Sequence, residues 1–315
     1  MAEVFPMTSR NLALSAVLLA LAAGPVFAQT PGTLAPQPLP PLEDPDGPAT
    51  PAKELFGRKL APAHLPPRVL GFYAHGCLAG AVPLPVTGES WQAMRLSRNR
   101  NWGHPELVGL LERLSAKARK VAGWPGLLVG DMSQPRGGPM FTGHDSHQVG
   151  LDADVWLTPM PARELTRAER EELSATLMVD ASRKRVDPAV WTPGHVALIR
   201  AAAEEPAVER IFVNAAIKKA LCRDAGPSDR GWLGKVRPMY GHDYHFHVRL
   251  RCPRDSRECQ AQDPVPRGEG CGAELDWWLR DAVLFPKPPK VPPKPKPPLT
   301  MASLPAGCRG VLQAP

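Results

Sequence analysis

Histidine is concentrated in two short parts of this chain, which together hold five of its nine histidines. The two blocks read Gly143-His-Asp-Ser-His147 and Gly241-His-Asp-Tyr-His-Phe-His247, so each begins with glycine. A zinc ion needs three or four imidazole or carboxylate donors at about 2 Å, delivered from a rigid backbone. The clustering therefore predicts a fold that brings these two distant blocks to a common metal site.

Each histidine block adjoins a segment with the period-two pattern of a β-strand. Along residues 244–250, His245 and His247 project from the same side, about 7 Å apart along the backbone. Along residues 149–157 the apolar side chains face one way, and two carboxylates face the other: Asp152 and Asp154. If the two strands share a sheet, imidazoles and carboxylates meet on one polar face. The joint arrangement favours a metal site, whereas a lone His-x-His would favour a solvated strand face.

The rest of the central region alternates between helical and strand patterns. Pro105 to Val121 has leucines at helical spacing and a proline near its start, which predicts an amphipathic helix. Further helices are expected over 193–203 and 215–223, and short strands over 126–130 and 211–213. We therefore predict an α+β fold, a single domain over residues 61–285 whose central, mainly antiparallel sheet bears the metal site and is flanked by helices.

The first 28 residues have the three parts of a secretory signal peptide: a short n-region, an apolar run from Leu12 to Ala23, and small residues at Val26-Phe-Ala28. The apolar run is too short to be a membrane span, and no later stretch approaches about 18 uninterrupted apolar residues. We predict that residues 1–28 are cleaved and that the mature protein is periplasmic, with no membrane span. An uncleaved N-terminal anchor is the alternative interpretation.

Two proline-rich segments flank the predicted domain. Residues 29–60 begin with a stretch rich in Pro, Gly, Thr and Ala that cannot bury enough apolar surface to fold alone, and they are expected to form a flexible leader. Residues 286–298 combine proline with lysine, which predicts extended polyproline II. Cys308 lies beyond them, so we expect the tail, residues 286–315, to be tethered to the body by a disulfide.

The cysteine content and the net charge indicate the cellular environment of the protein and the kind of partner it binds. Six cysteines, an even number in a chain expected to be exported, favour three disulfides, and Cys252 and Cys259 are close enough to close a local loop. The net charge of +7 implies attraction to polyanions, which for an exported protein points to cell-wall polymer or a membrane surface rather than nucleic acid. We expect no nucleic-acid partner, and the oligomeric state stays open, a dimer included.

The donor types at the predicted site suit zinc. Two histidines and one aspartate give a mixed nitrogen and oxygen set, whereas calcium prefers more oxygen ligands. A zinc site in a hydrolase keeps three protein ligands and an open position for water, whose pKa the ion lowers to about 7. A spare imidazole nearby would suit the role of general base, because an unperturbed histidine titrates near pH 6.5.

Four blocks carry a more specific signal: Arg98-Asn-Arg-Asn-Trp-Gly-His104, Gly143-His-Asp-Ser-His-Gln-Val-Gly-Leu-Asp-Ala-Asp154, Val213-Asn-Ala-Ala-Ile-Lys218 and Lys235-Val-Arg-Pro-Met-Tyr-Gly-His242. Together they resemble the penicillin-insensitive murein endopeptidases, and the resemblance runs from about Cys77 to Trp278. The motif is also similar to that of lysostaphin-type enzymes and zinc D-Ala-D-Ala peptidases. The resemblance implies a zinc (Zn²⁺) endopeptidase that hydrolyses D-alanyl-meso-diaminopimelyl cross-links in peptidoglycan with metal-activated water.

The same resemblance implies residue roles. It places the zinc ligands at His147, Asp154 and His247, the general base at His245, and further active-site histidines at His242 and His144, of which His144 could hold a second metal ion. It also implies the disulfides Cys222–Cys271 and, by what remains, Cys77–Cys308. From the strand pattern alone, Asp152 is an alternative ligand because it faces the same way as Asp154.

Several other residues have two interpretations. Arg98 and Arg100 could hold the carboxylates of a peptide stem or form a solvated basic loop. Five aromatic residues could wall a substrate groove or pack in the core: Trp156, Trp232, Tyr240, Trp277 and Trp278. The isolated histidines are expected to be structural: His64, His75, His104 and His195.

Two other functions are compatible with these residues. A metal-dependent D,D-carboxypeptidase or dipeptidase would use the same site on a smaller wall peptide, and only the shape of the pocket would distinguish it. A non-catalytic wall-binding or metal-storage module is the third candidate. His245 argues against that module, since storage of a metal does not need a free base.

Overall fold

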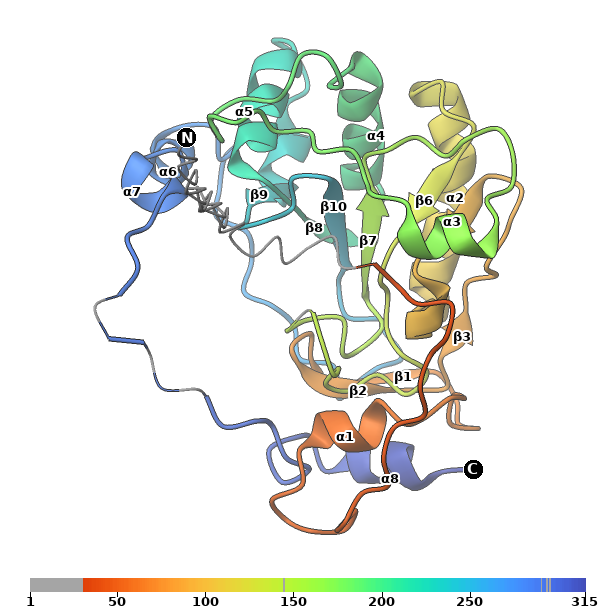
Figure 1. The fold of residues 1–315 in the computed structure, drawn as a ribbon. Helices are drawn as coiled ribbons and strands as arrows, with labels where there is room; N and C mark the ends of the chain where they lie inside the picture. The colour runs from red at the N-terminus through yellow and green to blue at the C-terminus, as the bar shows by residue number, and fades with distance from the viewer. Residues whose placement is uncertain (1–30, 144, 290, 293, 295) are drawn as a thin grey trace, which may run out of the picture.

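The computed structural model describes residues 31–143, 145–289, 291, 292, 294 and 296–315. The predicted signal peptide and His144 lie outside the described residues. A six-stranded sheet with the strand order β4-β6-β7-β10-β8-β9 forms the centre of the molecule (Figure 1). Its strands are Trp91–Ala93 (β4), Leu127–Val129 (β6), Asp152–Trp156 (β7), Val208–Val213 (β8), Val236–Pro238 (β9) and His245–Leu250 (β10).

The pairings change from the centre of this sheet to its edges. The inner pairs β6–β7, β7–β10 and β10–β8 are antiparallel, whereas the edge pairs β4–β6 and β8–β9 are parallel. The predicted α+β fold is confirmed, and the parallel edges are an addition to it. Within the described part of the chain, no helix combines the length and apolar character needed to cross a membrane.

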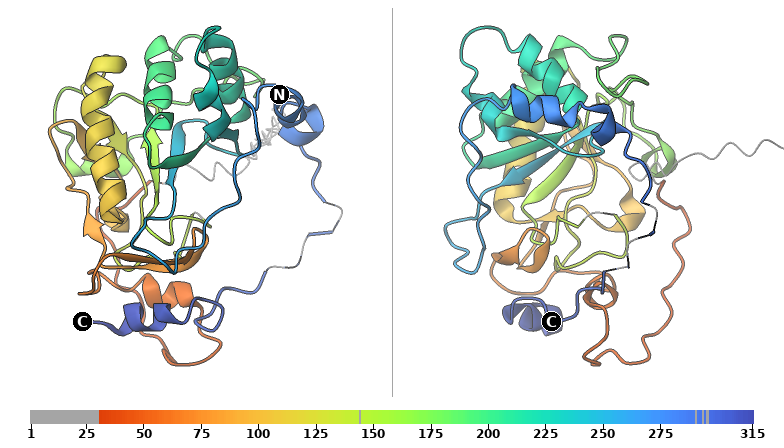
Figure 2. Two further views of the ribbon diagram at one scale, coloured as in Figure 1. Left: turned by 180° about the vertical axis from the view of Figure 1, so that it is seen from behind. Right: turned by 90° about the vertical axis from the view of Figure 1, so that its left-hand side faces the viewer.

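Three helices cover one face of the sheet: α2 (Pro105–Val121), α4 (Pro193–Ala203) and α5 (Ala215–Asp224) (Figures 1 and 2). The main core lies between them, where apolar side chains of β7 and β10 such as Val155 and Phe246 pack with the leucines of α2. Alternation along each strand then directs the polar side chains of β7 and β10 to the opposite face of the sheet.

The starts of these helices explain two of the isolated histidines. His104 precedes α2, and its Nδ1 accepts a hydrogen bond from the backbone N–H of Glu106, which the helix itself leaves without a partner. His195 Nδ1 accepts from the backbone N–H of Thr192 at the start of α4, and its ring stacks on Trp191. Both histidines are buried structural residues outside the histidine cluster.

The segment around α1 and the C-terminal segment meet at one end of the molecule (Figure 1). Helices α1 (Ala52–Phe56) and α8 (Gly307–Gln313) pack with the hairpin of β1 (Arg68–Phe72) and β2 (His75–Ala79), forming a second apolar cluster. Residues 52–56 belong to the segment expected to be a flexible leader, yet Phe56 is fully buried there. The proline-rich composition that suggested a leader did not reveal this contact with the distant C-terminus.

Short elements complete the fold. They are β3 (Val82–Pro83), β5 (Trp102–Gly103), α3 (Arg167–Glu172), α6 (Ala273–Trp278), α7 (Asp281–Leu284) and two 3-10 turns, η1 (Leu96–Arg98) and η2 (Gly231–Lys235). Three disulfides tie the elements together, and they join the pairs that the sequence and the resemblance led us to expect: Cys77–Cys308, Cys222–Cys271 and Cys252–Cys259.

Candidate metal centre

The strand register brings the central residues of the site together. β7 and β10 pair so that His247 lies directly opposite Asp154, on the polar face of the sheet. His247 Nδ1 is 3.2 Å from Asp154 Oδ1, and His147 Nε2 is 3.4 Å from the same oxygen. All three residues are buried, and one donor atom from each lies within 4.8 Å of the others. The register thus joins residues from two strands and one loop into a single cluster.

This cluster fits a zinc ion. Donor atoms bound tetrahedrally at about 2.0–2.1 Å lie about 3.3 Å from one another, close to the two distances to Asp154 Oδ1. Two imidazole nitrogens and one carboxylate oxygen are the donor set of several catalytic zinc sites, in which the fourth position is open. His147, Asp154 and His247 are therefore the residues that could hold a metal ion.

The loop that carries His147 is held in an unusual conformation. His147 has φ 69°, a left-handed value that few non-glycine residues adopt, and Gly143 before it has φ 91°. Gln148 anchors the loop, since its Nε2 donates to the carbonyls of Ala74 and Asp145 and its Oε1 accepts from Gly76 N. Strained residues of this kind persist only where the surroundings hold them, and they gather at functional sites.

Asp152 supports His247 from the side opposite Asp154. Its Oδ1 is 3.3 Å from His247 Nε2, and its two oxygens accept from Arg249 Nε (2.8 Å) and Nη2 (3.0 Å). Because Nε2 faces this carboxylate, Nδ1 is the His247 nitrogen turned towards Asp154. The geometry favours Asp154 over Asp152 as the ligand, and it gives Asp152 the role of orienting one.

The pKa values of this pair reflect the same contacts. Burial alone would raise the pKa of the fully buried Asp152, but Arg249 and His247 outweigh it and hold that pKa far below its usual range. Burial likewise lowers the pKa of His247, but Asp152 and Asp154 more than offset it, and the net effect is a raised pKa. Without a metal ion, the two carboxylates thus favour a protonated His247.

Two more histidines flank the cluster. His245 Nε2 is 3.5 Å from Asp154 Oδ1, and the His245 ring is 4.7 Å from the ring of His242. His242 also has a left-handed φ of 53°, and its Nδ1 lies 2.8 Å from the carbonyl oxygen of Tyr240. Burial, followed by the neighbouring His245 and His247, lowers the pKa of His242 well below its usual value. These surroundings favour the neutral form of His242, and Nδ1 is the nitrogen placed to donate to that carbonyl oxygen.

Arg98 and Arg100 meet on one carboxylate that the sequence patterns did not single out. Both guanidinium groups pair with Asp131 Oδ2, at 2.9 and 2.8 Å. Arg100 also donates to the carbonyl of Thr142, next to the loop that carries His147, and the Asp131 carbonyl accepts from Asp154 N. Neither arginine lies in a solvated loop. They connect the start of the loop to the strand that carries Asp154.

The five aromatic residues divide into two groups. Trp156 and Trp232 are buried in apolar clusters. Tyr240 and Trp277 are 58% and 44% exposed and adjoin the half-buried Trp278. Among the supporting residues, Asp131 comes from a loop without a recognisable motif, whereas Gln148 lies within the block 143–154 but had been given no role. Arg249 did carry a signal, because it shares the period-two face of His245 and His247.

Comparison with known proteins identifies the family. The family model described as penicillin-insensitive murein endopeptidase matches residues 69–313. Relatives of that name are 49% identical over 229 residues in Haemophilus influenzae (72% of this chain, 79% of the relative) and 48% identical over 238 residues in Yersinia enterocolitica (76% and 86%). A third, in Pectobacterium atrosepticum, is 44% identical over 248 residues (78% and 84%). The chain therefore belongs to the penicillin-insensitive murein endopeptidase family.

Proposed function

We propose that this protein is a zinc-dependent murein endopeptidase that hydrolyses D-alanyl-meso-diaminopimelyl cross-links in peptidoglycan. The observation that carries the proposal is the cluster of His147, Asp154 and His247, whose donor atoms lie within 4.8 Å of one another beside His245. The names of the relatives, all murein endopeptidases, support the substrate class.

The roles of the residues follow from their positions. His147, Asp154 and His247 would hold the metal ion, which would supply a Lewis acid for the peptide carbonyl and for the attacking water. His245 lies beside the ligand set, so its imidazole takes the proton from the attacking water and later gives it to the leaving amine. His242, with its ring 4.7 Å from that of His245, is the second active-site imidazole. Asp152 holds Nε2 of His247, so that Nδ1 of the same ring is directed towards Asp154.

We further propose that the protein acts in the periplasm after removal of residues 1–28. The three disulfides support this assignment, because such bonds form and persist in oxidising compartments. The positive net charge of +7 would favour contact with an acidic wall polymer.

The proposal is tested by digesting purified cross-linked muropeptide dimers and reading the products by mass. The wild-type protein should yield uncross-linked monomers, a chelator should stop the reaction, and added zinc should restore it. His247→Ala should be inactive, whereas His64→Ala, a change at an exposed histidine outside the cluster, should match the wild type. Release of a terminal D-alanine in place of monomers would show a carboxypeptidase, and cleavage that persists in the chelator would refute a metal enzyme.

A further inference from the structure

A group of exposed apolar side chains lies next to the candidate active site. We call this group the aromatic ledge, and its members are Met239, Tyr240, Trp277 and Trp278. Met239, Tyr240 and Trp277 are each more than a third exposed. The Tyr240 and Trp278 rings lie 4.8 Å apart, and those of Trp278 and Trp277 lie 5.3 Å apart. A cluster of large apolar groups left open to water marks a place where a ligand or partner binds.

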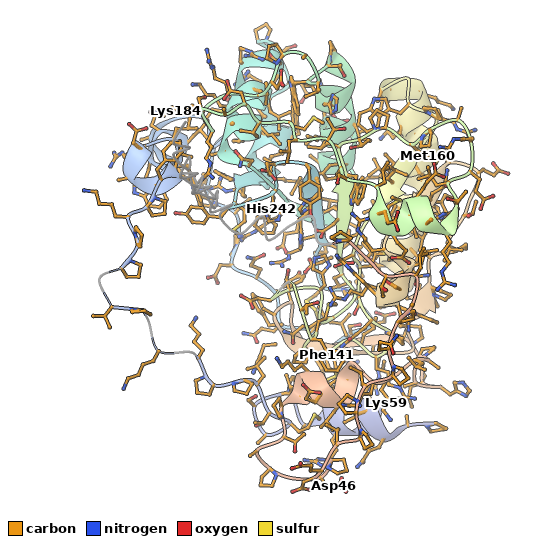
Figure 3. All side chains as sticks on the ribbon, viewed as in Figure 1. Asp46, Lys59, Phe141, Met160, Lys184 and His242 are labelled. Carbon is orange, nitrogen blue, oxygen red and sulfur yellow. A yellow bond between two sulfur atoms is a disulfide. The ribbon has the colours of Figure 1, made fainter. Side chains whose placement is uncertain are left out.

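The ledge is continuous with the histidine cluster. The carbonyl oxygen of Tyr240 lies 2.8 Å from His242 Nδ1, and the His242 ring is 4.7 Å from that of His245. Asn214 fixes this connection, since its Nδ2 donates to Gly241 O and its backbone N–H donates to His242 O. In Figure 3, His242 lies between the central sheet and the side of the molecule that carries α6 and α7. A substrate that reaches His245 can therefore extend onto the ledge.

The short helix α6, which contains Trp277 and Trp278, is anchored to the body of the protein. The Cys222–Cys271 disulfide ties the chain two residues before α6 to α5, and Leu275 of α6 is buried. The fully buried Lys218 donates to the carbonyls of Leu233 (2.7 Å) and Glu269 (2.6 Å). Such anchoring keeps exposed rings in a fixed position, which lowers the entropy lost when a ligand binds them.

The chemistry of the ledge fits a sugar ring better than a peptide. We propose that Tyr240, Trp277 and Trp278 form a subsite for an amino-sugar ring of the glycan strand. This inference rests on the proposed function. The stem peptides of peptidoglycan carry mostly methyl, carboxylate and amino groups, whereas the C–H face of a pyranose ring is broad enough to stack on an indole. Four residues of extended peptide span at most about 14 Å, so a sugar joined to the stem can reach the ledge.

The test compares two substrates that share the same cross-link. One is the muropeptide dimer with its disaccharides, and the other is the same dimer after enzymatic removal of the sugars. The ratio of kcat/KM for the two should exceed one in the wild type. Trp277→Ala should lower this ratio about three- to tenfold, because a ring-stacking contact contributes a factor of this size. Trp277→Phe, which keeps a ring, should retain most of it.

Two controls make the outcome decisive. Leu60→Ala changes an exposed apolar residue near Lys59, at the far end of the molecule from His242, and should leave the ratio unchanged (Figure 3). Calorimetry with peptide-free glycan chains should show binding to the wild type that Trp277→Ala weakens. A ratio that Trp277→Ala does not alter, or a wild type that binds no glycan, would overturn the subsite. Glycan binding without cleavage of either dimer would instead refute the proposed function.

Discussion

Asp152→Asn is the most informative single change near the metal centre, because it alters a contact of a ligand without removing the ligand. The fully buried carboxylate accepts from Arg249 at 2.8 and 3.0 Å and lies 3.3 Å from His247 Nε2. The amide keeps the shape of the side chain but loses its charge. One of its two terminal atoms also becomes an NH2 group. This group can only donate, so it cannot accept a hydrogen bond from Arg249 or His247.

Two effects of different size should follow. Arg249 is only 6% exposed, so loss of its partner leaves a buried charge uncompensated and should cost about 3–5 kcal/mol of unfolding free energy. Loss of the carboxylate that orients His247 should weaken zinc binding by about 10- to 100-fold, as for other partners of metal-bound histidines. The first effect is measured by urea unfolding of the metal-free protein, and the second by zinc titration against a competing chelator.

Arg249→Met is the matched control. It breaks the same ion pair, so it should destabilise the metal-free protein by a similar amount, but it leaves the carboxylate beside His247 Nε2. Its zinc affinity should therefore fall less than that of Asp152→Asn. Equal zinc affinities in Asp152→Asn and the wild type would refute the orienting role. Equal losses in both variants would show that the effect on zinc comes only from general destabilisation.

Three further predictions concern other parts of the molecule. His245→Ala should keep one zinc per chain while kcat falls by about 10² to 10⁴, the usual contribution of a general base, and loss of zinc from this variant would make His245 a ligand. The double change Cys77→Ser and Cys308→Ser should lower the unfolding free energy by about 2–5 kcal/mol while zinc stoichiometry is retained; an unchanged urea midpoint would contradict this. Burial, followed by Arg237, lowers the pKa of Lys218 in the folded protein to about 7, whereas a lysine in the unfolded chain has a pKa near 10.4. Between these two pH values the unfolded chain binds one more proton than the folded protein. The unfolding free energy should therefore rise with pH in this window, by up to about 1.4 kcal/mol per pH unit. Lys218→Met should flatten that rise, and an equal slope in the variant would contradict the assignment.

The central strands show how far sequence patterns predict this fold. Period-two alternation predicted that β7 and β10 each present a polar face, and the helix over Pro105–Val121 has the bounds that its leucine spacing indicated. Such patterns depend on neighbours along the chain. The parallel edge strands β4 and β9 are three residues long, too short to show a period, and their pairing depends on distant contacts.

The limits of prediction at the site have the same origin. Asp152 and Asp154 face the same way on one strand, so the strand pattern alone did not distinguish them; the resemblance pointed to Asp154, and the register against β10 places His247 opposite it. Asp131 was not predicted because its role depends on two arginines about 30 residues away that converge on one oxygen. The packing of Phe56 with the C-terminal helix was also missed, since proline-rich composition describes a segment alone and not what covers it.

The central claim is that one zinc ion, held by His147, Asp154 and His247, is required for cleavage of the peptide cross-link. It is tested most directly by stripping the purified protein of metal and adding zinc back in measured steps while cleavage of a muropeptide dimer is followed by mass. The rate should be negligible without zinc and rise linearly to a plateau at one zinc per chain, and Asp154→Ala should show neither stoichiometric binding nor cleavage. Full cleavage by the metal-free protein, or a plateau reached by Asp154→Ala, would contradict the account.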